Sequence, residues 1–284
     1  MKCYLCNGTE FKTRANKVRD NENISVIECV KCNLVTLSSL SHIDDSHYQK
    51  GNMHKKGYSK EQWIDETKND DLRRLNFLKD KIKNKKILDF GCGNGGFLLL
   101  SEKFTEINNG IELEKSMFPY FKKNRLKVWE SLEDAIIKSE HKYDFITSFH
   151  VFEHLSDPIN ILSQLSNLLS KGGEIIIEVP NANDALLTFY KNSDFSDFTY
   201  WSQHLFLYNE INIIDLVKKA GLKINWVKQI QRYKLSNHLH WLSNGKPGGH
   251  NIWKVFNDND LDEIYSKKLA SLGICDTIMI SCKK

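Results

Sequence analysis

The sequence predicts an α/β protein in which helices cover both faces of a largely parallel sheet, with a small metal-binding domain in front of it. Three observations lead to this prediction. From about residue 66 onward, short apolar runs typical of strands alternate with longer amphipathic segments typical of helices. A glycine-rich turn joins the first of these strands to a helix. Two Cys-x-x-Cys pairs lie within residues 1–40.

The composition is that of an ordinary globular chain of 284 residues, 40% hydrophobic and 27% charged. This length accommodates one large domain and a small accessory one. A net charge of +4, carried mostly by Lys rather than Arg, gives no reason to expect nucleic acid as a partner. No apolar run reaches the roughly 20 residues of a membrane span, and we expect no secretory leader. These features predict a cytoplasmic protein without a membrane span.

Strands and helices alternate regularly after a polar, irregular stretch at 41–65, which we expect to be a linker. Strands are expected at 86–90, 109–113, 127–129, 143–149, 173–179, 224–230 and 277–281. Helices are expected at 66–82 and 95–103, after the second and third strands, and at 158–169, 210–220 and 261–272. Short apolar strands separated by helices indicate a parallel sheet with both faces covered.

Two segments, 181–208 and 231–257, do not follow the alternation and are rich in aromatic residues. Each follows the carboxyl end of an expected strand, where open α/β sheets place their ligand crevice. We therefore expect both segments to be insertions that form a lid over a substrate.

The strand ending at Phe90 continues into Gly91-Cys92-Gly93-Asn94-Gly95, which leads into a helix. Glycine tolerates a positive φ in such a turn, and its missing side chain lets a ligand approach the backbone. The unpaired N–H groups of the helix N-terminus then face that ligand. Glu112 closes the next strand, where a carboxylate can accept both hydroxyls of a ribose. This is a nucleoside-binding arrangement.

The glycines alone fit two classes of cofactor. Gly91, Gly93 and Gly96 satisfy the dinucleotide pattern G-x-G-x-x-G, so an NAD enzyme is one interpretation. Asp89 favours a different ligand, because a carboxylate at this point would hold an ammonium group and repel a pyrophosphate. Together these residues favour S-adenosylmethionine.

Four motifs occur in order: ILDFGCGNG, GIE, YDFITSFHVFEHLSDP and LLSKGGEIIIEVP. This series resembles class I methyltransferases, in particular the ubiquinone-biosynthesis O-methyltransferases and related small-molecule enzymes. The resemblance implies a Rossmann-like seven-stranded sheet over residues 66–284, with the last strand antiparallel, and residues 41–65 as a cover of the cofactor site.

The resemblance also implies the residues that contact S-adenosylmethionine. Asp89 and the loop glycines Gly91, Gly93 and Gly95 would hold its methionine part, and Glu112 its ribose. The remaining implied contacts are Ser131 and Leu132 at the adenine, Phe149 and His150 near the sulfonium, and Arg73 or Arg74 at the carboxylate.

The paired cysteines are Cys3, Cys6, Cys29 and Cys32. Two Cys-x-x-Cys turns together supply four thiolates for a tetrahedral zinc ion, a closed structural site. Residues 1–40 contain few apolar residues, so a metal would supply the stability that a core cannot. A redox dithiol is the alternative interpretation.

A cysteine-rich ribbon in front of a methyltransferase domain resembles enzymes of deoxysugar and surface-glycan (capsule) biosynthesis. Sugar C-methyltransferases of this layout normally carry a further C-terminal domain. Here the sequence given ends with the last strand of the methyltransferase, which favours O-methylation.

Deprotonation of an alcohol acceptor calls for a general base, most often His. We expect His150 and His204 to be catalytic. A cluster of His150, Glu153 and His154 could instead bind a divalent ion, or Glu153 and His154 could be a buried hydrogen-bonded pair.

The expected function is S-adenosylmethionine-dependent O-methylation of a sugar or other small polar precursor of a surface polysaccharide, free or nucleotide-linked. Aromatic residues in the two insertions could pack on sugar rings or merely anchor the loops: Tyr200, Trp201, Tyr233, Trp241 and Trp253. C-methylation of a keto nucleotide sugar is an alternative. RNA methylation and a non-catalytic cofactor-binding module are alternatives from other classes, and an oligomer is compatible with the sequence.

Overall fold

The structure is a computed structural model that describes residues 1–43 and 59–284. Its main sheet has seven strands in the order β10-β11-β8-β7-β4-β5-β6. The parallel strands are β4 (Lys86–Phe90), β5 (Ile107–Ile111), β6 (Lys127–Trp129), β7 (Tyr143–Phe149) and β8 (Leu169–Pro180). Strand β11 (Thr277–Lys283) runs antiparallel to β8, and the edge strand β10 (Lys223–Ile230) pairs antiparallel with β11. The predicted Rossmann-like α/β fold is confirmed.

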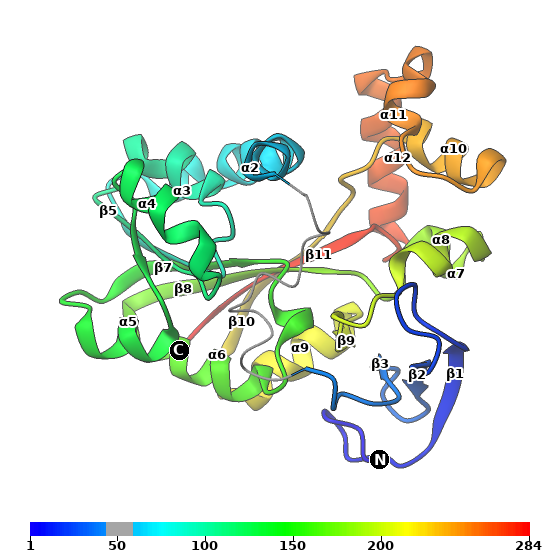
Figure 1. The fold of residues 1–284 in the computed structure, drawn as a ribbon, viewed down its shortest axis with the longest axis horizontal. Helices are drawn as coiled ribbons and strands as arrows, with labels where there is room; N and C mark the ends of the chain where they lie inside the picture. Colours follow the sequence, from blue (N-terminus) through cyan, green and yellow to red (C-terminus); the bar gives the residue numbers. More distant parts are fainter. Residues whose placement is uncertain (44–58) are drawn as a thin grey trace.

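Helices cover both faces of this sheet (Figure 1). On one face lie α2 (Lys60–Ile82), α3 (Gly96–Ser101) and α4 (Phe118–Lys123), and on the other α5 (Leu132–Lys138), α6 (Pro158–Ser166) and α9 (Glu210–Lys219). Side chains alternate along β8: Ile176 packs with the α2 cluster, whereas Ile175 and Ile177 pack with the α6 and α9 cluster. Both faces are buried, which explains the continuous apolar run of this strand.

Helix α2 begins at Lys60 rather than at the predicted residue 66. The hydroxyl of Ser59 accepts from the N–H of Gln62, and the Gln62 side chain accepts from the N–H of Ser59. This capping box starts the helix in a polar stretch where no apolar periodicity was available. Residues 60–65 of the expected linker are therefore helical, and 44–58 lie outside the described residues.

The two expected insertions contain more regular structure than their sequence indicated. The first carries α7 (Ala185–Thr188), α8 (Ser193–Thr199) and the short strand β9 (Phe206–Leu207). The second carries α10 (Leu235–Asn244) and α11 (Gly249–Ile252), and with α12 (Asn259–Ser271) these form an arm that projects beyond the sheet (Figure 1). The short helices were missed because their polar caps, such as Asn192 for α8, resemble loop sequence.

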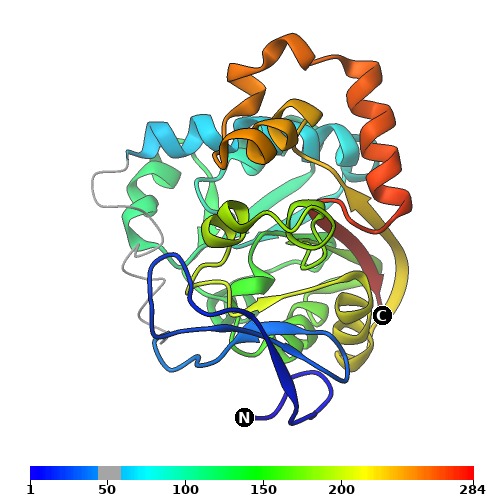
Figure 2. The same ribbon diagram turned by 90° about the vertical axis from the view of Figure 1, so that its right-hand side faces the viewer.

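The cysteine-rich segment forms a second sheet in the order β1-β2-β3-β9. Its strands are β1 (Phe11–Ala15), which was not predicted, β2 (Val26–Cys29) and β3 (Val35–Leu37). Because β9 comes from the first insertion, the ribbon shares a sheet with the methyltransferase-like part of the chain. Figure 2 shows the blue ribbon lying against the yellow-green segment that contains β9.

In the part of the chain that the structure describes, no helix combines the length and the apolar character that crossing a bilayer requires.

Candidate functional site

The glycine loop after β4 adopts a conformation that needs glycine. Gly91, Gly93 and Gly95 have φ values of 72°, 56° and 75°, a region that other residues rarely adopt. A Cβ on Gly91 would also collide with the side chain of Val151. Gly95 is the N-cap of α3, so the free N–H groups of this helix face the loop.

Two carboxylates, the buried Asp89 and the partly buried Glu112, lie at the carboxyl ends of the adjacent strands β4 and β5. Asp89 accepts from the hydroxyl of Thr147 at 2.7 Å, and its burial raises its pKa to about 7. Glu112 accepts from the N–H of Gly93 at 2.8 Å and from the N–H groups of Leu113 and Glu114. Burial raises the pKa of Glu112. The loop and the two acids are thus connected directly and offer partners for an ammonium group and for ribose hydroxyls.

Helix α2 contacts the glycine loop. A Cβ on Gly93 would lie 3.1 Å from the ring of Trp63, and the side-chain amide of Asn94 donates to Thr67 at 2.9 Å. Trp63, which lies in the expected linker, therefore contacts the loop at which the cofactor is expected.

The residues expected at the adenine lie after β6. The hydroxyl of Ser131 accepts from the N–H of Asp134 at 3.0 Å and caps α5, and Leu132 is buried. The Ser131 hydroxyl thus accepts one bond at the helix cap, and within the part of the chain that the structure describes its O–H stays free to donate to a ligand.

Arg73, expected to pair with the cofactor carboxylate, forms ion pairs within the protein. It donates to Asp70 at 3.1 Å and to the buried Glu178 at 2.6 Å. Arg74 also donates to Glu178, at 3.3 Å, and its guanidinium lies 4.6 Å from the ring centre of Phe149. Burial opposes ionisation of Glu178, but Arg74 and the other cations hold its pKa well below the usual range. The signal for Glu178 was an acid inside the apolar run IIIEVP.

His150 is held by carboxylates on both sides. It has a φ of 57° at the end of β7, and its N–H donates to the carbonyl of Glu178 at 2.8 Å. Its ring lies 3.2 Å from Glu178 Oε1 through Nε2 and 3.3 Å from Glu153 Oε1 through Nδ1. Burial and the guanidinium of Arg232 oppose its protonation, but the two carboxylates outweigh them and raise its pKa. Both ring nitrogens of His150 thus face carboxylates of the protein.

His204 joins a different cluster. Donor atoms of Glu153, His154 and His204 all lie within 4.8 Å of one another. Burial and the neighbouring His154 lower the pKa of His204 to about 3. Burial opposes ionisation of Glu153, but His150 and the other imidazoles lower its pKa to about 2. Within the described residues, the buried Nδ1 of His204 has no hydrogen-bond partner. The cluster thus offers a carboxylate and a neutral imidazole with a free lone pair.

The divalent site considered from the sequence is changed by this arrangement. The tertiary structure replaces His150 by His204 in the group of possible ligands, because the His150 ring lies between Glu153 and Glu178. Carboxylate and imidazole donors fit a divalent transition metal.

The four cysteines come together as predicted. Sγ atoms of Cys3 and Cys32 and of Cys6 and Cys29 are 3.4 Å apart, and all four lie within 4.8 Å of one another. Asn7 and Asn33 take positive φ values of 57° and 60° in the two Cys-x-x-Cys turns. Four thiols on two such turns fit a closed zinc site, in agreement with the expected structural role.

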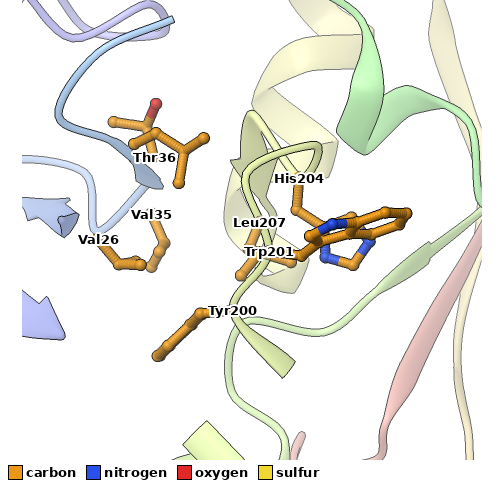
Figure 3. A pocket seen from close by; sticks show the side chains of 8 residues that line it. Val26, Val35, Thr36, Tyr200, Trp201, His204 and Leu207 are labelled. Carbon is orange, nitrogen blue, oxygen red and sulfur yellow. The ribbon is translucent and has the colours of Figure 1, made fainter. Parts of the chain in front are cut away.

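The aromatic residues of the insertions divide into two kinds. Tyr200 and Trp241 are buried and anchor their segments. Trp201 is half-buried beside His204, with ring centres 5.7 Å apart, and both line a hollow against the ribbon (Figure 3). This hollow is too small to hold a water molecule, so it is a packing gap rather than a binding cavity.

A family model for a methyltransferase domain matches residues 35–225, which is more than half of the 284 residues. The chain belongs to this family. It is therefore an S-adenosylmethionine-dependent methyltransferase, which decides between the two cofactor classes that the glycine pattern allowed.

The methyltransferase resembles curated ubiquinone biosynthesis O-methyltransferases. It is 26% identical over 188 residues to the one from Hydrogenovibrio crunogenus, covering 58% of this chain and 77% of that protein. It is 30% identical over 121 residues to the one from Coxiella burnetii, covering 39% of this chain and 50% of that protein. The chain spans about half the length of most of the curated relatives that it matches.

Two solved structures have the same fold as the methyltransferase. One is a possible histamine N-methyltransferase from Thermotoga maritima, with 20% identity, a TM-score of 0.51 and coverage of 79% of this chain and 93% of that one. The other is magnesium protoporphyrin IX methyltransferase from Synechocystis with bound S-adenosylhomocysteine, with 10% identity, a TM-score of 0.50 and coverage of 87% and 100%.

The raised pKa of Asp89 leads to a pH-dependent affinity for S-adenosylmethionine. If the ionised carboxylate holds the cofactor ammonium, protons compete with the cofactor below pH 7. We expect the Kd to rise about tenfold between pH 8 and pH 6 and to level off above pH 8. Titration calorimetry across this range measures it. Asp89→Asn should bind weakly with no such dependence; an unchanged pH profile in this variant would exclude Asp89 as the titrating group.

Replacing Glu178 should destabilise the fold. Glu178→Gln leaves Arg74 and His150 buried without their shared anion, and breaking a buried ion pair costs about 3–5 kcal/mol. Urea unfolding measures the loss. Glu106→Gln is the control, because the Glu106 side chain is 57% exposed and pairs with Lys86 at 3.6 Å, so its effect should stay within about 0.5 kcal/mol.

Proposed function

We propose that the protein transfers the methyl group of S-adenosylmethionine to a hydroxyl of a sugar or other small polar precursor of a surface polysaccharide. The observation that carries this proposal is His204, in the segment after β8: a nitrogen of its ring lies within 4.8 Å of a carboxylate oxygen of Glu153, and its buried Nδ1 has no hydrogen-bond partner among the described residues. A hydroxyl acceptor requires a group of this kind to take its proton. The curated relatives are named for O-methylation in ubiquinone biosynthesis, which supports oxygen as the acceptor atom.

In this proposal the glycine loop, Asp89 and Glu112 hold the cofactor. When bound, S-adenosylmethionine supplies an electrophilic methyl group and leaves as a neutral thioether. Gly91 and Gly93 let the backbone approach it, Asp89 takes the ammonium and Glu112 exchanges its bond from Gly93 for bonds from the ribose hydroxyls. Phe149, buried against Phe97, keeps water away from the end of β7.

In this proposal His204 accepts the proton of the acceptor hydroxyl at Nδ1. Because burial and His154 lower its pKa to about 3, His204 depends on the nearby carboxylate of Glu153 to stabilise the imidazolium that forms. His150 holds Glu153 in place through its 3.3 Å contact, and Glu178 holds His150. In-line displacement needs little more than this positioning and the exclusion of water.

A second mechanism rests on the same three side chains. Glu153, His154 and His204 would hold a divalent cation, which would acidify a bound hydroxyl. In that case His204 is a ligand rather than a base. Measurement of bound metal separates the two mechanisms, because only the metal-assisted one requires a divalent ion at Glu153, His154 and His204 in addition to the zinc expected at the four cysteines.

The sugar acceptor is supported by two features. Trp201 is half-buried beside His204, and an aromatic face there can pack on a sugar ring. In its sequence, the cysteine-rich ribbon in front of the methyltransferase domain resembles the layout of enzymes of surface-glycan biosynthesis.

The proposed acceptor is tested by incubating the protein with sugars and nucleotide sugars and with methyl-labelled S-adenosylmethionine. Mass spectrometry and NMR of the product should show one added methyl group on oxygen. A methyl group on carbon, or transfer to RNA alone, would contradict the proposal.

Removing the base should reduce turnover without affecting the cofactor. We expect His204→Asn to lower kcat by about a hundredfold or more, the usual contribution of a general base, with the Kd for S-adenosylhomocysteine unchanged. His141→Gln is the control, because His141 precedes the amino end of β7, at the opposite edge of the sheet. Full activity in His204→Asn would rule out the assignment of the base.

A further inference from the structure

The segment that carries His204 is held on its N-terminal side by the ribbon. Asp20 accepts from the N–H of Ser202 at 3.0 Å and from its hydroxyl at 2.6 Å. The N–H of Arg19 donates to the carbonyl of Tyr200 at 2.9 Å, and its guanidinium lies 4.4 Å from the ring centre of Trp201. These contacts come from one turn of the ribbon, between β1 and β2.

The ribbon also holds the segment on its C-terminal side. Strand β9 pairs with β3, with Thr36 opposite Phe206 and Val35 opposite Leu207. The hydroxyl of Thr36 donates to the carbonyl of Leu205 at 2.8 Å. Backbone pairing of this kind fixes the register of Phe206 and Leu207, which lie two and three residues after His204.

His204 therefore lies between two attachments to the ribbon. Its N–H donates to the carbonyl of Trp201 at 3.0 Å and closes a turn from Trp201 to His204. Ser202, which Asp20 holds, lies inside this turn. Its ring lies 5.1 Å from that of His154. On the other side of the segment, the carbonyl of Gln203 lies 2.7 Å from Nδ1 of His154. A shift of either attachment would move His204 relative to Glu153 and His154.

The charge-assisted bonds of Asp20 are the strongest of these contacts, because an ionised acceptor strengthens a hydrogen bond. Asp20 is remote in sequence from the glycine loop and lies in neither Cys-x-x-Cys turn. Neither the cofactor site nor the cysteine cluster accounts for its two bonds to Ser202.

We propose that Asp20 is a positioning residue for methyl transfer: through Ser202 it sets the position of His204, so the ribbon forms one wall of the acceptor site. This inference rests on the proposed role of His204. It assigns the cysteine-rich ribbon a part in acceptor binding and proton transfer in addition to stability.

The test compares Asp20→Ala and Asp20→Asn with Glu22→Ala in the full-length protein. Glu22 lies in the same turn and pairs with Lys17 at 3.6 Å, with side chains 87% and 54% exposed, so it is a matched acidic control. Amide hydrogen exchange of residues 200–207 is measured with no acceptor present, together with kcat, the acceptor KM and the Kd for S-adenosylhomocysteine.

We expect Asp20→Ala to speed exchange in 200–207 about tenfold or more and to lower kcat by a similar factor, since a charged hydrogen bond is lost. The Kd for S-adenosylhomocysteine and exchange in α3 should stay within about twofold of the wild type, because neither depends on this bond. Asp20→Asn should recover much of the loss, because its amide oxygen still accepts from Ser202. Glu22→Ala should match the wild type.

Three results would overturn the inference: unchanged exchange in 200–207, faster exchange with unchanged kcat, or equally faster exchange in α3, which would mean general destabilisation. A wild-type protein that transfers no methyl group would instead contradict the proposed function, while exchange would still report on the Asp20–Ser202 contact.

Removal of zinc with a chelator gives an independent measurement. If four thiolates hold the turn that contains Asp20 and the strand β3, metal loss should speed exchange in residues 200–207 as well as in the ribbon and leave α3 protected. Faster exchange confined to the ribbon would contradict a coupling between the cysteine cluster and residues 200–207.

Discussion

The rest of the site depends on the interactions of the buried carboxylate of Glu178 with two arginines and a histidine. It lies in the central strand β8 and receives Arg73 and Arg74 from α2 and the ring of His150 from the end of β7. A carboxylate with no exposure is tolerated only because several cations surround it. One group thereby fixes a helix and a strand end against each other. The glycine loop contacts α2 through Asn94, and Glu153 contacts His150. Both are therefore positioned indirectly by Glu178.

The site has two halves with different physical origins. The cofactor half is local in sequence: a strand, a glycine turn, a helix and the acid that ends the next strand. The half proposed for the acceptor combines distant segments, since Glu153 and His154 follow β7 while His204 lies after β8. The charges also differ. Asp89, with a pKa raised to about 7, is sensitive to a cationic ligand, whereas Glu153, with a pKa of about 2, stays an anion.

The ribbon and the larger sheet are not independent units. Strand β9 belongs to the first insertion yet completes the ribbon sheet, and side chains of both parts, such as Leu34 and Tyr208, belong to one buried cluster. The side-chain amide of Asn212 in α9 donates to the carbonyl of Cys32 at 2.7 Å. A segment of forty residues with few apolar side chains thus gains a core by sharing that of its neighbour, in addition to any metal.

The sequence by itself determined the features that depend on short-range spacing: the parallel sheet, the glycine loop with Asp89 and Glu112, and the four-cysteine cluster. Periodicity and turn chemistry act within a few residues, so these patterns can be recognised without coordinates. The start of α2 was missed because its capping box lies in a polar stretch. Only the tertiary structure decided that Arg73 pairs with Glu178, that His204 rather than His150 joins Glu153 and His154, and that β9 completes the ribbon sheet. Each of these contacts joins residues that are far apart in the chain, and the residue types alone do not specify which partners the packing brings together.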